Sequence, residues 1–316
     1  METRLLGQTG LTVGSIGLGA WQLGTGVVEN PAWGGGPDEA ASQAIVEASL
    51  ALGVNFFDTA PGYASGRSEE LLGEALEGRR ADVVLCSKFG HTPEGGTDWA
   101  ATSIEGSVEQ SLKRLRTDYL DILLLHSPPP DLLDGSSPHY AELARLQASG
   151  VIRWYGASVD FGADVDRLVE TTDSQVLEIW FNVLHQDPFA ALERAAAKGL
   201  GVIVKVPLDS GWLAGRYTAD SVFTDVRRRW TPEQIARRAH LVERFRELLP
   251  DGVPMAHGAL AFVLAQHFVS TVIPGAKSVT QLRDNVAAAD ALLSPDTVAA
   301  IGELWEDEIR PAQLPW

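Results

Sequence analysis

The feature that most restricts the fold is a repeated order in which a short apolar segment is followed by an amphipathic one. About eight such pairs succeed one another along the 316 residues. The apolar segments, which we predict to be strands, are Ser15–Leu18, Val54–Asp58, Val83–Lys88, Tyr119–Leu125, Ile152–Ala157, Val176–Phe181, Val202–Val206 and Thr271–Ile273. Strands that are almost continuously apolar are typical of parallel sheets covered on both faces by helices. Eight of them predict an α/β fold of the closed (β/α)8 barrel type.

Helices are predicted where apolar residues recur every three or four positions. These segments are 37–52, Ser68–Leu76, Ser103–Leu115, Tyr140–Ala148, Ala163–Thr171, Phe189–Lys198, a helix beginning at Thr231, His257–Gln266 and Val279–Ala291. Three helix starts have the spacing of a capping box, namely Thr102 with Glu105, Thr231 with Gln234, and Ser278 with Gln281.

The two ends of the chain add elements outside the eight units. Arg4–Val13 has glycines at a turn and predicts a β-hairpin that caps the bottom of the barrel. An extra C-terminal helix is expected near Pro295–Trp305, and the tail Arg310–Trp316 is expected to pack across the rim. No change in composition marks a domain boundary, so one domain is predicted over residues 1–316.

Composition excludes several classes of partner. The net charge of −17 argues against binding to nucleic acids or to acidic membrane surfaces. The single cysteine, Cys86, lies in an apolar run, which predicts a buried structural thiol in a reducing compartment. The N-terminus lacks a signal peptide, and the longest apolar runs, such as Ala259–Ala265, are too short to span a bilayer. A cytoplasmic protein is therefore expected.

Four polar residues stand where predicted strands end or in the loop that follows. Asp58, Lys88 and His126 end three strands, and Tyr63 follows Asp58 after a Pro-Gly turn. Because parallel neighbours place their carboxyl ends on one rim, these four side chains are expected to meet there. Each alone is more often an ordinary polar group at a strand end, so the inference depends on all four occurring together. An acid, a phenol, an amine and an imidazole in one place predict proton transfer to or from a substrate oxygen.

The chemistry expected at this rim depends on the acidity of the Tyr63 phenol. A free tyrosine has a pKa near 10, and a nearby ammonium is expected to lower it by stabilising the phenolate. Asp58 would hold Lys88 in place, and His126 could orient a substrate carbonyl or pass a proton. Such a site gives a proton to oxygen as a hydride reaches carbon. Since no side chain donates hydride, a nicotinamide cofactor is implied.

These residues lie in segments that resemble the aldo-keto reductase family. The most specific match is Asn55–Tyr63, followed by Gly66, Ser68, Glu69 and Gly73, and the likeness runs from Arg4–Leu11 to Ile273–Ser278. The resemblance implies a (β/α)8 barrel and NADPH-dependent reduction of aldehydes and ketones. It also implies a tetrad of Asp58, Tyr63, Lys88 and His126, with Tyr63 as the proton donor, and it implies no metal.

A dinucleotide-binding glycine fingerprint is missing, so the expected cofactor contacts come from the resemblance. Gly19, Ala20, Trp21 and Asp58 would lie at the nicotinamide, and Ser158, Glu178 and Lys205 near its carboxamide and ring. Pro207, Leu208, Ser210, Gly211 and Leu213 would wrap the pyrophosphate, and Gly275, Lys277, Ser278, Gln281 and Asn285 would hold the adenosine phosphate. NADP is favoured and NAD stays open, because no arginine stands at Ser278 or Gln281 to grip a 2′-phosphate.

Three positions depart from the family pattern. Val159 stands where asparagine is frequent, Glu178 replaces a glutamine, and Lys205 replaces an aromatic residue. Glu178 and Lys205 fall on neighbouring strands, so we expect an ion pair between them beneath the nicotinamide, because each would otherwise be a costly buried charge. The alternative is a shifted register in which one of them faces solvent.

The substrate pocket is expected to be aromatic. Trp21, Trp33, Phe89 and Trp99 are the candidate substrate contacts, beside His126. Such a wall suits an aldehyde, a ketone or the face of a sugar. Two other functions stay open, namely a sugar or alcohol dehydrogenase that works in the oxidative direction and a nicotinamide-binding regulatory subunit with little turnover.

Overall fold

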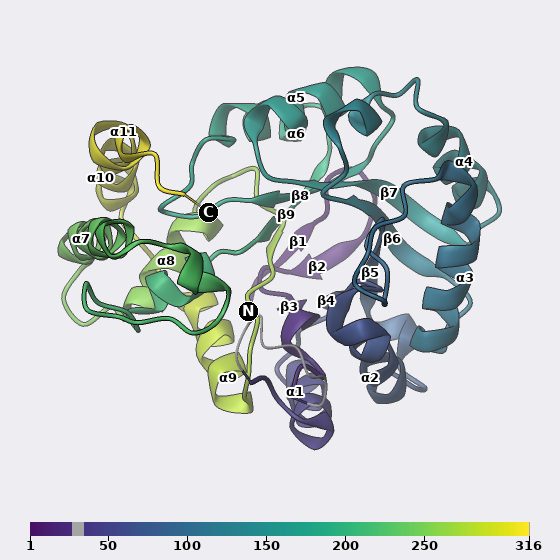
Figure 1. Cartoon of the computed structure of the whole chain (residues 1–316), viewed down its shortest axis with the longest axis horizontal. Helices are drawn as coiled ribbons and strands as arrows, with labels where there is room; N and C mark the ends of the chain where they lie inside the picture. Colours follow the sequence, from purple (N-terminus) through teal and green to yellow (C-terminus); the bar gives the residue numbers. More distant parts are fainter. Residues whose placement is uncertain (27–34, 316) are drawn as a thin grey trace.

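The computed structural model of the chain, which describes residues 1–26 and 35–315, is a parallel β-barrel surrounded by helices (Figure 1). Its strands are β3 (Leu18–Gly19), β4 (Phe56–Asp58), β5 (Val84–Phe89), β6 (Leu120–His126), β7 (Ile152–Val159), β8 (Val176–Trp180), β9 (Gly201–Lys205) and β10 (Thr271–Val272). They pair in the order β10-β9-β8-β7-β6-β5-β4-β3. Two parallel bridges, Ile16 with Val272 and Gly19 with Gly275, join the first strand to the last. The predicted closed barrel is confirmed.

Helices cover the outside of the barrel in chain order. They are α1 (Glu39–Ala51), α2 (Arg67–Ala75), α3 (Ile104–Leu115), α4 (Pro138–Ala148), α5 (Gly162–Thr171), α6 (Phe189–Ala197), α7 (Pro232–Leu248), α8 (Met255–Leu264), α9 (Val279–Ala287), α10 (Pro295–Leu304) and α11 (Arg310–Ala312). The larger apolar core lies between these helices and the strands. None of the helices in the described part of the chain combines the length and apolar character needed to cross a membrane.

The predicted helix caps have three different outcomes. Thr231 and Gln234 form the complete capping box at the start of α7. The Ser278 hydroxyl accepts from the Gln281 N–H, but the Gln281 side chain accepts from the Lys277 N–H instead of closing the box. The prediction for Thr102 is wrong, because a 3-10 turn, Ala101–Ser103, precedes α3 and no side chain caps that helix.

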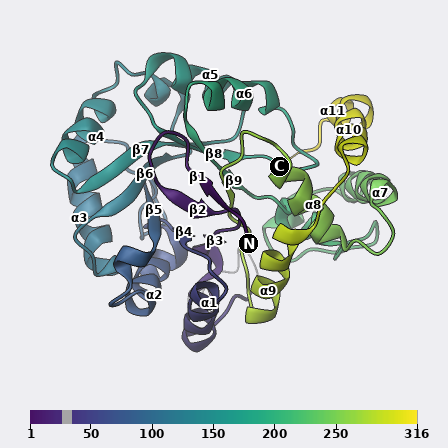
Figure 2. The same ribbon diagram turned by 180° about the vertical axis from the view of Figure 1, so that it is seen from behind.

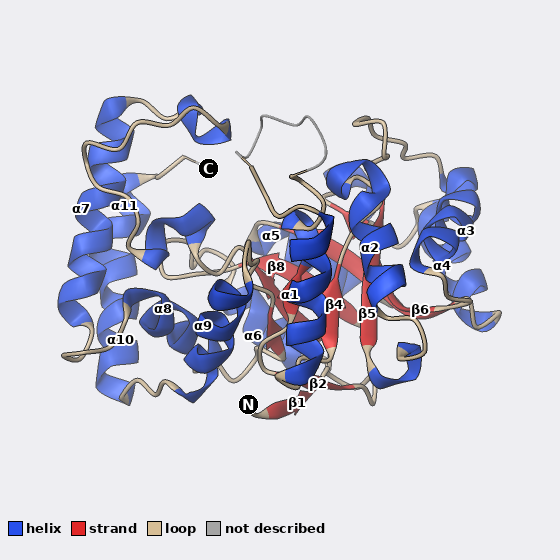
Figure 3. Ribbon diagram, turned by 90° about the horizontal axis from the view of Figure 1, so that it is seen from below, coloured by secondary structure: helices blue, strands red, loops and turns tan. Residues whose placement is uncertain are grey.

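A hairpin closes the lower end of the barrel, as the sequence predicts. β1 (Thr3–Leu5) and β2 (Thr12–Gly14) pair antiparallel and lie across the barrel in Figure 2 and beneath its strands in Figure 3. Leu6 and Val13 are fully buried in a second apolar cluster with inward-facing strand residues such as Phe56. Gly7 has a φ of +53°, and a Cβ there would lie 2.3 Å from the Gly201 nitrogen, so no larger residue fits this close approach.

The C-terminal segment returns to the upper end of the barrel. After α10 the chain forms a π-helical turn, Trp305–Ile309, and the short α11. The Pro315 carbonyl then accepts a hydrogen bond from Arg238 of α7. Leu314 lines a small hollow together with Trp180 at the end of β8. The tail therefore packs at the rim, while Trp316 lies outside the described residues.

Candidate active site

The ends of three neighbouring strands bring the predicted polar residues together. Asp58 is the last residue of β4, Lys88 the penultimate residue of β5, and His126 the last residue of β6. Tyr63 opens a 3-10 turn, Tyr63–Gly66, in the loop after β4. The pairing of β6, β7 and β8 sets His126 beside Ser158, and Ser158 beside Glu178. The expected convergence on one rim is thus observed.

Lys88 is the centre of this group. Its Nζ lies 2.5 and 2.6 Å from the two Asp58 carboxylate oxygens and donates to the Thr59 carbonyl at 3.1 Å. It also donates to the Tyr63 hydroxyl at 3.4 Å and lies 3.4 Å from Glu178 Oε2. Because Lys88 donates to the phenol oxygen, the phenolic hydrogen stays available for another acceptor.

Burial decides the acidity of Tyr63. It raises the pKa of the phenol, the Lys88 ammonium lowers it, and the net pKa lies well above the ordinary value. The predicted net fall is wrong for the protein alone, because the sequence does not show how fully the surrounding chain desolvates the phenol. The Lys88 pKa is raised well above its usual value, since Asp58 and Glu178 together outweigh its own burial. Tyr63 is therefore a protonated phenol beside a charged amine at neutral pH.

His126 is neutral at neutral pH. Burial and the nearby Lys88, His91 and Lys205 side chains hold its pKa well below the usual value. Its ring meets that of Tyr63 edge-on, with centroids 5.7 Å apart, and its buried Nδ1 has no hydrogen-bond partner among the described residues. The His91 ring lies 4.6 Å away. His91 was missed in the sequence, although it follows the end of β5 by only two residues.

The residues after Tyr63 fasten α2 to the barrel. The Ser68 hydroxyl donates to the Ala20 carbonyl at 2.8 Å. Glu69, fully buried, accepts from the Ser87 hydroxyl at 2.6 Å and pairs with Arg114 at 2.7 Å. A Cβ on Gly73 would lie 2.5 Å from the Arg114 carbonyl oxygen, so α2 and α3 approach each other at a glycine. This part of the motif holds the Tyr63 turn rather than contacting a ligand.

The predicted ion pair between Glu178 and Lys205 is wrong. Lys205 Nζ pairs with Asp160 at 2.9 Å and donates to the Ser158 hydroxyl at 2.8 Å. The Ser158 hydroxyl in turn donates to Glu178 Oε1 at 2.8 Å, so a serine separates the two charges. The cause is the register, in which Lys205 pairs with Trp180, two residues beyond Glu178. Both charged residues nevertheless face the barrel interior, so the alternative with one facing solvent is also wrong.

The third departure from the family pattern, Val159, points outward from the barrel toward the helices. Val159 is 3% exposed and belongs to the core between strands and helices. Side chains alternate along a strand, so the residue after the inward-facing Ser158 faces outward. Ser158 is itself fully buried and lies outside the pocket lining.

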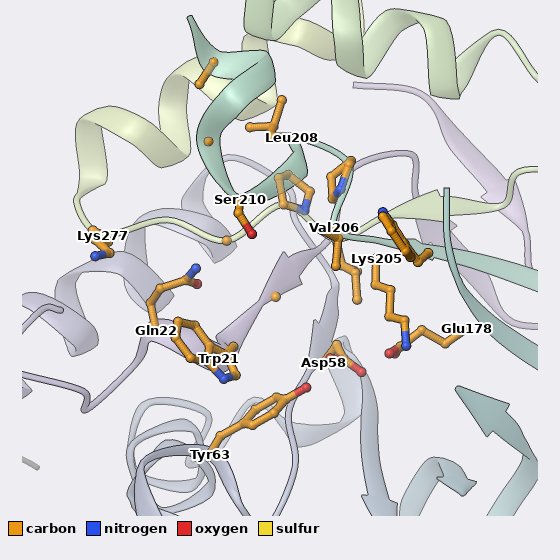
Figure 4. A pocket seen from close by; sticks show the side chains of 18 of the residues that line it. Trp21, Gln22, Asp58, Tyr63, Glu178, Lys205, Val206, Leu208, Ser210 and Lys277 are labelled. Atoms are coloured by element: carbon orange, nitrogen blue, oxygen red, sulfur yellow. The ribbon is translucent and has the colours of Figure 1, made fainter. Parts of the chain in front are cut away.

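A pocket of about 770 Å³ lies at this end of the barrel (Figure 4). Its lining contains fifteen of the predicted site residues, namely Gly19, Trp21, Asp58, Tyr63, His126, Glu178, Lys205, Pro207, Leu208, Ser210, Gly211, Gly275, Lys277, Gln281 and Asn285. Residues that the sequence did not suggest also line it, among them Gln22, His91, Asp160, Trp180, Arg216, Tyr217 and Arg227. In Figure 4, Tyr63, Asp58 and Glu178 lie toward one end and Lys277 toward the other.

The remaining predicted contacts lie elsewhere. Ala20 and Leu213 are fully buried, and Ser278 is exposed at the start of α9. Phe89 packs edge-on against Trp99, with ring centroids 5.9 Å apart, and neither ring is among the described residues that line the pocket. Trp33 lies outside the described residues. The tryptophans among the described lining residues are Trp21 and Trp180, and the sequence missed the second of these.

The far end of the pocket carries positive charge on a folded-over loop. After β9 the chain takes positive φ at Val206, Asp209 and Ser210, which turns it across the barrel mouth. Arg227 donates to the Ser210 carbonyl at 2.9 Å and lines the pocket with Arg216 and Lys277. Burial and Arg227 lower the pKa of Lys277. Asp225, which pairs with Arg227, and Asp284 also line the pocket, so these five side chains leave one net positive charge to attract an anionic group of a ligand.

A metal does not fit the polar cluster as it stands. Ligand atoms of Asp58, Cys86 and Glu178 lie within 4.8 Å of one another. The Lys88 ammonium lies in contact with both carboxylates, so it supplies the positive charge that a metal ion would bring.

The family model for the aldo/keto reductase family matches residues 15–306. The chain belongs to this family of oxidoreductases. L-galactose dehydrogenase of Arabidopsis thaliana is 32% identical over 303 residues, covering 93% of this chain and 90% of that protein. NADH-specific methylglyoxal reductase of Escherichia coli is 31% identical, covering 95% and 97%. An aldo-keto reductase from Bacillus halodurans in its holo form superposes with a TM-score of 0.81 at 29% identity, covering 96% of both chains.

Proposed function

We propose that this aldo-keto reductase reduces aldehyde or ketone carbonyls to alcohols, with Tyr63 as the proton donor. The observation that carries the proposal is the contact of Lys88 with both Asp58 and Tyr63 in a pocket large enough for a dinucleotide and a small substrate. A nicotinamide supplies the hydride when it is bound. No described side chain has that chemistry.

The protein side of the reaction follows from the hydrogen bonds. Tyr63 gives its phenolic proton to the substrate oxygen, and the electron pair of that O–H bond stays on the phenol oxygen. Lys88 already donates to this oxygen at 3.4 Å and therefore stabilises the phenolate as it forms. His126, neutral and beside Tyr63, is placed to donate to the substrate carbonyl from its pocket-facing nitrogen. Trp21 and Trp180 add apolar surface to the pocket lining, which helps to exclude water.

The pocket fits a nicotinamide dinucleotide in two ways. Glu178 Oε2 is a buried oxygen with Lys88 as an ionic neighbour at 3.4 Å and no hydrogen bond from the described residues, so it suits the amide of the expected carboxamide. Arg216, Arg227 and Lys277 gather at the other end, where phosphate groups would lie. These cations support NADP over NAD, with the arginines coming from the loop after β9 instead of from Ser278 or Gln281. The predicted wrapping and adenosine contacts, like the cytoplasmic location, stay proposals.

The test is turnover followed at 340 nm with NADPH and with NADH against a panel of aldehydes, ketones and aldoses. We expect NADPH oxidation with at least one carbonyl. Tyr63→Phe should lower kcat by about 100-fold or more, because it removes the acid, with the Kd for NADPH changed less than twofold. Turnover retained by Tyr63→Phe would show that the proton comes from elsewhere.

The two alternatives have their own outcomes. Faster oxidation of alcohols or aldoses with NADP+ than reduction at neutral pH would favour a dehydrogenase. Tight NADPH binding with no turnover of any panel member would favour a regulatory subunit. The complete set of Asp58, Tyr63, Lys88 and His126 weighs against the second alternative, because a purely binding protein has no need of a buried acid–amine pair.

A further inference from the structure

Lys88 is held by two carboxylates rather than one. Asp58 approaches from β4 at 2.5 Å, and Glu178 approaches from β8 on the other side at 3.4 Å. Both side chains are at most 3% exposed, so water screens neither charge. The Ser158 hydroxyl fixes Glu178 by donating to its other oxygen. The sequence predicted Lys205 as the partner of Glu178 beneath the nicotinamide, but the contacts of Glu178 are with Lys88 and Ser158.

The second carboxylate lies close to the phenol. Lys88 Nζ is 3.4 Å from the Tyr63 oxygen and 3.4 Å from Glu178 Oε2, so these two oxygens are separated by at most the sum of the two contacts. A phenolate on Tyr63 would face a negative charge at this short range. Burial and the Glu178 charge raise the pKa of Asp58 well above its usual value, so Glu178 competes with Asp58 and with the phenolate for the positive charge of Lys88. Both effects favour the protonated phenol.

Other titratable groups face the same cluster, and their charges contribute to the electrostatic potential at the Tyr63 oxygen. They are Asp58 on β4, Cys86 on β5, His91 after β5, His126 on β6, Asp160 after β7 and Lys205 on β9. Burial raises the pKa of Cys86 and lowers that of His91, so both are neutral near pH 7. Burial raises the pKa of Glu178, but Lys88 and Lys205 outweigh it and hold the pKa below its usual value. Glu178 is thus charged, with Lys205 as its nearest cation after Lys88.

We propose that Glu178 is a positioning residue for proton transfer, which acts through Lys88 to keep Tyr63 protonated at a higher pH than Asp58 alone would allow. Lys205, linked to Glu178 through Ser158, acts in the opposite direction. Together these charges set the alkaline limit of carbonyl reduction. This inference rests on the proposed role of Tyr63 as proton donor.

The expected size follows from Coulomb's law. A unit charge about 7 Å from the phenol oxygen, at an effective dielectric constant of about 20, shifts a pKa by about one to two units. On the alkaline side of the pH profile, kcat/KM for reduction falls as Tyr63 loses its proton, and this fall is the alkaline limb. Glu178→Gln should therefore shift the alkaline limb to lower pH by about one to two units. Lys205→Met should move that limb upward. If Glu178 and Lys205 had only structural roles, both variants would lose activity, but their alkaline limbs would not shift in opposite directions.

The kinetic test uses NADPH and 4-nitrobenzaldehyde from pH 6 to pH 12, because burial places the wild-type limb well above the ordinary tyrosine pKa. Glu69→Gln is the matched control, because Glu69 is an equally buried glutamate that contacts Ser87 and Arg114 but not Lys88. Its limb should coincide with that of the wild type. An unmoved limb in Glu178→Gln, while Tyr63→Phe abolishes turnover, overturns this inference and leaves the proposed function standing. Turnover retained by Tyr63→Phe removes the basis of both.

A second measurement needs no turnover. Phenolate absorbance at 295 nm is titrated in wild type and in Glu178→Gln, and the curve of the matching Tyr63→Phe variant is subtracted from each, which isolates Tyr63 from the other four tyrosines. We expect the Tyr63 phenolate to form at a lower pH in Glu178→Gln. An equal or higher midpoint, or no phenolate in Glu178→Gln while the protein stays folded to pH 12, contradicts the proposal.

Discussion

The ion pair between Arg238 and Asp209 should be the strongest single polar contribution to the fold outside the catalytic cluster. Asp209 follows β9 in the loop that crosses the barrel mouth, and Arg238 reaches it from α7. Their side chains are 0% and 3% exposed. Arg238 also donates to the Pro315 carbonyl and lies 4.6 Å above the Trp230 ring. One guanidinium thus ties the loop, α7 and the C-terminal tail together.

Arg238→Met removes the cation and leaves a buried carboxylate without a partner. One oxygen of Asp209 already has no hydrogen bond among the described residues, so this carboxylate cannot be satisfied by its remaining neighbours. Breaking a buried pair from one side costs about 3–5 kcal/mol. The free energy of unfolding, measured by urea denaturation with circular dichroism, should fall by that amount. The Kd for NADPH should rise, because Ser210 beside Asp209 lines the pocket.

Two controls distinguish the effect of breaking the Arg238–Asp209 ion pair from the effect of losing a long side chain. Arg238→Met combined with Asp209→Asn removes both charges and should recover more than half of the lost stability. Arg145→Met breaks exposed pairs with Glu142 and Glu105 and should cost less than about 1 kcal/mol. A loss below about 1 kcal/mol for Arg238→Met alone would refute the reasoning, because a buried charge would then have found another partner.

Three further predictions follow from single positions. Gly156→Ala should lower the free energy of unfolding, measured with urea, by about 3 kcal/mol or more. The added Cβ would lie 1.7 Å from the Val176 carbonyl oxygen and force β7 and β8 apart. The control is Gly106→Ala, which has open space around it and should change the free energy of unfolding by less than about 1 kcal/mol. His126 has a lowered pKa, so the unfolded chain binds the extra proton and stability is lost as the pH falls below about 6.5; His126→Gln should remove up to about 2 kcal/mol of the loss between pH 7 and pH 5, and an unchanged loss would mean that His126 is charged in the folded state. Arg227→Gln should weaken NADPH binding, measured by fluorescence titration, about tenfold while NADH binding changes less than threefold; equal weakening of both would place Arg227 away from the phosphate that distinguishes them.

The barrel and its polar rim were predictable because both depend on local pattern. Apolar runs such as 120–125 leave few choices for a buried strand, and a polar residue directly after such a run must lie at its end. Asp58, Lys88 and His126 each obey this rule. Tyr63 is separated from β4 by the four loop residues 59–62, and its place at the rim was predicted from the Pro-Gly turn before it.

The errors concern properties that depend on three-dimensional detail. The partner of Lys205 depends on a register offset of two residues and on the reach of a flexible side chain, neither of which the sequence records. The acidity of Tyr63 depends on how much of the chain covers it. The cationic end of the pocket was missed because Arg216 and Arg227 lie in a long irregular loop without periodicity, and Trp180 because it reads as an ordinary apolar strand residue.

The hairpin below the barrel has a consequence for how the chain is made. Gln8 donates to the Gly199 carbonyl, and Arg4 donates to the Val269 carbonyl, so the hairpin binds partners that are synthesised much later than itself. Until about residue 200 has emerged, Leu6 and Val13 lack part of the apolar cluster that buries them, which includes Ile203 and Ile273. We therefore expect nascent chains to dock their starting segment late, after several βα units have already assembled. We expect the β1–β2 hairpin to close the lower end of the barrel only after most of the barrel strands have formed.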